Sequence, residues 1–199
     1  MTLDLVFALM LFACVSSITP GPNNLMLMAS GANYGIRRTI PHMLGISLGH
    51  AFMITMVGVF LLRLFETYPV INAILKVLSV AYMLWLAWKI AMAMPPEAKE
   101  VTGKPLTSLQ AAAFQWVNPK AWYMAITAIT VYVPAETGVW RGSVMVACVF
   151  AATNLPSVSV WAWIGVQVRR VLGNPRRLRQ FNFTMAVLLV ASLYPVLSD

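Results

Sequence analysis

The sequence is dominated by six long apolar stretches, each long enough for a helix that crosses a membrane. Such a helix needs about 20 mainly apolar residues, because each residue adds about 1.5 Å across a hydrocarbon core of about 30 Å. A water-facing surface does not cover stretches of this kind: 60% of the residues are hydrophobic and 10% are charged. The sequence therefore predicts an all-α membrane protein with six transmembrane helices. The expected spans are 3–32, 41–62, 70–94, 106–133, 142–168 and 181–197.

The first stretch is expected to be a retained helix and not a signal peptide. Its start, Met-Thr-Leu-Asp, has no basic segment, and it continues into Thr-Pro-Gly-Pro instead of a small-residue cleavage site. The connectors between stretches are too short for a soluble domain, so 1–199 is expected to be a single membrane domain. Cys14 and Cys148 lie in apolar stretches without metal-ligand spacing, and no P-loop pattern is present. The sequence therefore predicts no metal, cofactor or structural disulfide.

The basic residues predict the orientation of the chain. The formal charge of +8 comes from short connectors and not from a basic stripe among aromatic residues, so a nucleic-acid partner is not expected. Basic loops stay in the cytoplasm. The excess of lysine and arginine in every second connector therefore predicts that both termini lie outside. The opposite connectors carry only Arg63 and Arg141. The ten basic residues of the expected cytoplasmic side are Arg37, Arg38, Lys89, Lys99, Lys104, Arg169, Arg170, Arg176, Arg177 and Arg179.

Two of the stretches contain a proline-centred polar break. The first reads Thr-Pro-Gly-Pro-Asn-Asn at 19–24, and the fourth reads Asn-Pro-Lys at 118–120. Pro20 and Pro119 lie 99 residues apart, half of the chain, and each opens a group of three spans. An odd number of spans in each half gives the halves opposite orientations, as in the inverted repeats of many secondary transporters. The expected architecture is a 3+3 inverted repeat, with halves of about 1–100 and 105–199 and broken helices one and four.

The chemistry of these breaks suits a zwitterion. Proline has no N–H, so Pro20 and Pro22 leave two carbonyls of the preceding helix without helical donors, and Pro119 does the same for Gln115. A new half-helix begins after each break with free N–H groups at the positive end of its dipole. A plain structural kink is the alternative, as is internal packing for the polar segment around Asn154. The predicted substrate-binding residues are Thr19, Pro20, Gly21, Pro22, Asn23, Asn24, Asn118, Pro119, Lys120 and Asn154.

Three segments resemble a known family, the lysine exporters and homoserine/threonine resistance exporters. They are the first break at 19–24, the third stretch with Trp-Leu-Ala-Trp-Lys-Ile at 85–90, and Phe-Gln-Trp-Val-Asn-Pro-Lys-Ala at 114–121. The likeness runs along the whole chain and is strongest to the cysteine/O-acetylserine exporter branch. It implies export of amino acids or small derivatives across the bacterial inner membrane. Many members carry an acidic residue within the second or fifth helix, and this sequence has none there.

Three basic side chains have open roles at this point. His50 lies deep in the second stretch, and histidine has an ordinary pKa of about 6.5, so it is the proton-coupling candidate. A neutral histidine bonded across helices is the alternative. His42 is expected to be an interfacial residue. Lys120 is expected either to bind the substrate carboxylate or to snorkel to the membrane surface.

Two other classes of protein compete with the transporter. Gly45 to Gly49 matches the nucleophile-elbow pattern G-x-S-x-G, but an elbow needs a strand-to-helix turn, so a small-residue helix contact is the preferred interpretation. Cys14 and Cys148 suggest a thiol-redox enzyme, and a receptor or assembly subunit is the other rival. The expected partners are a small amino acid, the lipid bilayer and a possible second copy of the chain.

Overall fold

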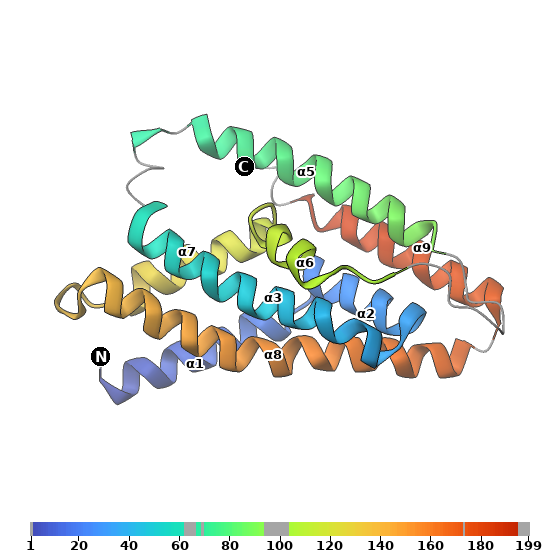
Figure 1. Cartoon of the computed structure of the whole chain (residues 1–199), viewed down its shortest axis with the longest axis horizontal. Helices are drawn as coiled ribbons and strands as arrows, with labels where there is room; N and C mark the ends of the chain where they lie inside the picture. The colour runs from blue at the N-terminus through green and yellow to red at the C-terminus, as the bar shows by residue number, and fades with distance from the viewer. Residues whose placement is uncertain (1, 62–66, 69, 94–103, 173, 195–199) are drawn as a thin grey trace.

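The computed structural model describes residues 2–61, 67–68, 70–93, 104–172 and 174–194, and within them the chain forms helices and no strand. In Figure 1 most of these helices run lengthwise, with the N-terminus at one end and the α2–α3 and α8–α9 junctions at the other. The elements are α1 Leu3–Ile18, α2 Pro22–Tyr34, α3 Ile36–Met56, the π-helical η1 Val57–Leu61, α5 Val70–Ala91, α6 Ser108–Gln115, α7 Pro119–Tyr132, the 3₁₀ turn η2 Ala135–Thr137, α8 Val139–Leu172 and α9 Pro175–Ala191.

Several helices have the length and composition of membrane spans. Three meet both conditions alone, within Ile36–Phe60, Ala73–Ala91 and Val139–Val171, and α1 with α2 forms a fourth, bent by 54°. The outer surface of the helices is apolar, as a bilayer requires. More than half of the side-chain surface is exposed at Phe7, Phe52, Trp88, Trp163 and Phe183.

Three helices, α3, α8 and α9, begin earlier than the sequence indicated, and the difference is largest for α3 and α9. The second span was expected to start at Pro41, but α3 starts at Ile36 and holds Pro41 inside it. The last span was expected to start at 181, but α9 starts at Pro175, where proline is tolerated because the first helical N–H needs no partner. Basic residues expected in loops, such as Arg37 and Arg176, are therefore helical. The expected span ends at 62, 94 and 197 lie outside the described residues.

Glycines bring α2 and α8 into close contact. A Cβ atom on Gly31 would overlap the carbonyl of Ala162, and one on Gly165 would overlap the carbonyl of Met28. These two helices make the most extensive contact between any pair of described elements. Small residues allow such an approach within a membrane, and it holds α2 firmly behind the first break.

The pair Gly45 and Gly49 has the same role between α3 and α6. A Cβ atom at these positions would overlap Ser108 and Ala112. The predicted small-residue helix contact is confirmed. Ser47, between the two glycines, lies inside α3 and its hydroxyl donates to the carbonyl of Ala151 at 3.2 Å, so the pentapeptide forms no nucleophile elbow.

Candidate functional site

The first break leaves the start of α2 uncapped. The helix begins at Pro22 with Gly21 as its N-cap, and no side chain bonds to its first N–H groups. Asn23 and Asn24 lie in the first turn, where backbone N–H groups have no carbonyl within the helix. The positive end of the helix dipole lies at the same place. This turn is therefore suited to an anionic group.

The second break resembles the first but is capped. Here α7 begins at Pro119, and the side chain of Asn118 accepts a hydrogen bond from the N–H of Lys120 at 3.2 Å. Both half-helices thus start with a proline in first position. Pro22 and Pro119 hold these positions, whereas Pro20 lies two residues before α2 and precedes the extended residue Gly21.

The carbonyls freed by the prolines find donors elsewhere in the chain. The carbonyl of Ser16 accepts from the hydroxyl of Thr19 at 2.9 Å, and that of Ile18 accepts from the indole N–H of Trp161 at 2.9 Å. The carbonyl of Gln115 accepts from the backbone N–H three residues later at 3.3 Å. All three therefore have partners in this structure.

Lys120 connects the two breaks. Its Nζ donates to the carbonyl of Thr19 at 2.7 Å, to the Thr19 hydroxyl at 2.9 Å and to the carbonyl of Pro20 at 3.3 Å. Gly21 leaves room for this side chain, since a Cβ atom there would lie 2.8 Å from Lys120 Cδ. The lysine ammonium therefore occupies two carbonyls and a hydroxyl of the first break.

A pair of amides forms a second link between the breaks. Asn23 Nδ2 donates to Gln115 Oε1 at 2.8 Å, and Gln115 Nε2 donates back to Asn23 Oδ1 at 3.2 Å. Gln115 also donates to the carbonyl of Ala111 at 2.8 Å. Gln115 was not among the predicted site residues. Its signal in the sequence is a polar residue directly after the apolar run 111–114, three positions before Asn118.

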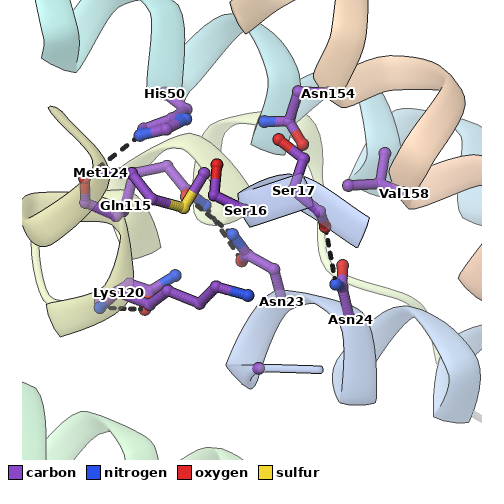
Figure 2. A pocket seen from close by; sticks show the side chains of 13 residues that line it. Ser16, Ser17, Asn23, Asn24, His50, Gln115, Lys120, Met124, Asn154 and Val158 are labelled. Atoms are coloured by element: carbon purple, nitrogen blue, oxygen red, sulfur yellow. Dashed lines mark hydrogen bonds between the residues drawn. The ribbon is translucent and has the colours of Figure 1, made fainter. Parts of the chain in front are cut away.

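These residues surround a buried cavity of about 20 Å³ (Figure 2). A volume of that size holds about one water molecule, so the side chains nearly fill the site. One polar group there, the buried hydroxyl of Ser17, has no hydrogen-bond partner among the described residues. The amide of Asn154 lies beside it in Figure 2. The lining consists of Ser16, Ser17, Gly21, Asn23, Asn24, His50, Gln115, Asn118, Lys120, Ala121, Met124, Asn154 and Val158.

His50 reaches the same cavity from α3. Its Nε2 lies 3.2 Å from the carbonyl of Ala121, in the first turn of α7, and its ring meets Phe150 edge-on at 5.3 Å. The histidine is buried. This contact is the cross-helix bond that the sequence left as the alternative, and it also places the imidazole beside the second break.

The structure brings most of the predicted residues together. Thr19 and Pro20 bond to Lys120, and Pro22 and Pro119 begin the half-helices. Ser16, Ser17 and Gln115 join the site without having been predicted. The predicted residues that line the cavity are Gly21, Asn23, Asn24, His50, Asn118, Lys120 and Asn154.

Two interrupted helices whose broken ends meet at a buried polar cavity, among helices that cross a membrane, define a membrane transporter. The chain belongs to the family described as LysE type translocator, whose model matches residues 14–192. It is therefore a translocator and not an enzyme. Cys14 and Cys148 are both exposed, and neither lines the cavity.

Named relatives of this family cover nearly the whole chain. The sequence is 30% identical over 190 residues to the cysteine/O-acetylserine efflux protein of Salmonella paratyphi A, covering 96% of each chain. It is 29% identical over 190 residues to the protein of the same name from Escherichia coli (strain K12), with the same coverage. No solved structure matches the chain. The family resemblance inferred from the three motifs is confirmed.

Proposed function

We propose that this chain exports a small amino acid or amino-acid derivative, such as cysteine or O-acetylserine, across the bacterial inner membrane. The observation that carries the proposal is the uncapped start of α2, which opens on a buried cavity whose described lining includes Lys120 and no acidic residue. A carboxylate at this point accepts bonds from the N–H groups of Asn23 and Asn24. Lys120 adds the opposite charge.

The other polar groups of the site suit the ammonium and the side chain of such a substrate. When the Lys120 ammonium turns toward the carboxylate, it releases the carbonyls of Thr19 and Pro20 for the substrate ammonium. The unpartnered hydroxyl of Ser17 and, beside it, the amide of Asn154 then face the substrate side chain. Both are compatible with a thiol or a small ester, the groups that distinguish cysteine and O-acetylserine.

A 3+3 inverted repeat of six crossings agrees with part of the helix contacts, although the extensive contact of α2 with α8 has only a small counterpart between α7 and α3. In such a repeat, α1 with α2 corresponds to α6 with α7, α3 to α8, and α5 to α9. The contact of α1 with α8 then corresponds to that of α6 with α3, and both are extensive. Under the same correspondence α3 and α8 exchange places, and so do α5 and α9. Both pairs are in contact, as expected for helices on either side of a two-fold axis.

The way the breaks are joined supports a proposed alternating-access mechanism. The cavity is nearly filled, so substrate enters only when the breaks separate. The contacts that must open are the bond from Lys120 to Thr19 and the amide pair of Asn23 with Gln115. Substrate polar groups replace these bonds, which keeps the energetic cost of opening low.

Efflux from proteoliposomes tests the proposed function. Vesicles that contain the purified chain and labelled O-acetyl-L-serine are expected to lose the label faster than protein-free vesicles. Excess unlabelled substrate inside the vesicles should compete and slow the exit of label, and the equivalent carboxamide should not. A chain that reconstitutes but moves no amino acid at all would instead be a receptor or an assembly subunit.

The orientation has its own test. We expect the C-terminus and the segment 169–179 to lie on opposite sides of the membrane, with the basic segment inside, because basic loops are retained in the cytoplasm. Reporter fusions at residue 199 and within 173–175 measure this. A cytoplasmic C-terminus would contradict both the orientation and the count of six crossings.

His50 is the proposed proton carrier if export is coupled to protons. Its imidazole lines the cavity and contacts the first turn of α7, so separation of the breaks changes its surroundings. We expect His50→Gln to retain downhill exchange and to lose accumulation driven by a pH gradient. The measurement compares both fluxes in the same vesicles. Unchanged pH-driven flux would remove His50 from the coupling mechanism.

A further inference from the structure

A second cavity lies further along α2, outside the proposed transport site. It has a volume of about 80 Å³ and lies between α2, α3, α5 and the segment 104–106. Asn24 in the first cavity and Asn33 in the second are nine residues apart on the same helix, which is about 14 Å. This volume is several times that needed for one water molecule.

His42 is the unusual residue of this cavity. It was expected at the membrane interface, but only 2% of it is exposed, and neither ring nitrogen has a hydrogen-bond partner in the described structure. Buried polar groups nearly always have a partner. Its neighbours follow that rule, since Ser30 bonds Thr39 at 2.9 Å and Asn33 bonds Asn182 at 2.7 Å. An imidazole without a partner on a cavity wall indicates a ligand.

The charge of the cavity indicates the class of ligand. Lys89 and Lys104 line it from two different segments, and none of its described lining residues is acidic. Lys89 is held with its Nζ 4.6 Å from the centre of the Trp85 ring. Arg169 adds a further positive charge nearby, because it donates to the carbonyl of Asn33 at 3.5 Å. These groups attract an anion.

The apolar part of the lining limits the anion to one with a short hydrocarbon body. Met26, Leu86, Ile90 and Leu106 form much of the wall. We propose that this cavity is a second binding site, for a small carboxylate whose charged end accepts a hydrogen bond from His42 and whose apolar body lies against these side chains. Sources of such a ligand are the exported amino acid itself and other small carboxylates of the cell.

The two histidines allow both cavities to be observed in one spectrum. The chain contains only His42 and His50, and each lines one cavity. The purified full chain is labelled with ring-¹⁵N histidine, and the signals are assigned with the His50→Gln variant. O-acetyl-L-serine, its carboxamide, butyrate and butyramide are then titrated separately.

We expect a saturable shift of the His42 ring nitrogens with a carboxylate and none with the matched amide. Response to O-acetyl-L-serine alone would assign the site to the exported amino acid, and response to butyrate as well would assign it to small carboxylates in general. Lys104→Gln should weaken binding by up to about fivefold, as for an exposed charge pair. Lys76→Gln, on α5 but outside the cavity, should leave it unchanged.

The inference fails if neither carboxylate shifts His42, or if each amide shifts it equally. The proposed transport site is assessed separately through His50. A His42 shift without any effect of O-acetyl-L-serine on His50 would support the second site and count against the first. The reverse result would support the transport site and overturn the second one.

Discussion

Pro20→Ala together with Pro22→Ala is expected to reduce transport at least about 100-fold while membrane insertion persists. Alanine restores two N–H groups, which bond to the carbonyls of Ser16 and Ile18 and continue α1 into α2. The N–H groups of Asn23 and Asn24 then lie within a continuous helix and are no longer free for a carboxylate. The two charge-assisted bonds that are lost are worth about 1.5 to 3 kcal/mol each.

Initial export rates in proteoliposomes with equal amounts of reconstituted protein measure this effect. Pro41→Ala is the control for removal of a proline from a membrane helix, because Pro41 lies inside α3 and does not line the first cavity. Near-normal export by the double variant would show that these prolines only bend the helix. A similar loss in the Pro41 variant would indicate a general effect of helix straightening.

Lys120→Met is expected to raise the KM for export by about 10- to 100-fold, the value of one charge-assisted hydrogen bond. Methionine retains most of the length of the lysine side chain, so Gly21 still has an unbranched neighbour. The cavity loses the only charged side chain of its described lining, and the substrate carboxylate loses its partner. Lys120→Arg should recover part of the affinity.

Lys76→Met is the control for the removal of a lysine from a membrane helix. It lies on α5 and does not line the cavity, so its KM should remain that of the unmodified chain. If Lys120→Met instead left the KM unchanged and reduced the maximal rate, the lysine would serve to link the two breaks and would not bind the substrate carboxylate.

The breaks were predictable from sequence because their cause is local. Proline removes an N–H wherever it occurs, so Pro22 and Pro119 mark the starts of the half-helices without knowledge of the fold. Asn118 could be placed for a similar reason, since asparagine before a helical proline is a strong N-cap. The presence of a similar proline-centred break in the second half then indicated that both breaks belong to one site.

The partners across the cavity were not predictable, because they depend on tertiary packing. Asn23 and Gln115 are 92 residues apart, and Trp161 reaches Ile18 from 143 residues away. A lone lysine inside a span suggested snorkelling as readily as bonding to the other break. His42 was misplaced for the same reason, since its burial depends on the helices that pack against α3, chiefly α6 and α8.

Counterflow of paired analogues tests the central claim most directly. Proteoliposomes loaded with unlabelled O-acetyl-L-serine or L-cysteine are placed in trace labelled substrate, and parallel vesicles are loaded with the corresponding carboxamides. We expect transient accumulation of label only when the internal compound carries a carboxylate, and none in the Pro20→Ala, Pro22→Ala variant. Equal accumulation with the carboxamides, or full accumulation in that variant, would contradict carboxylate binding at the start of α2.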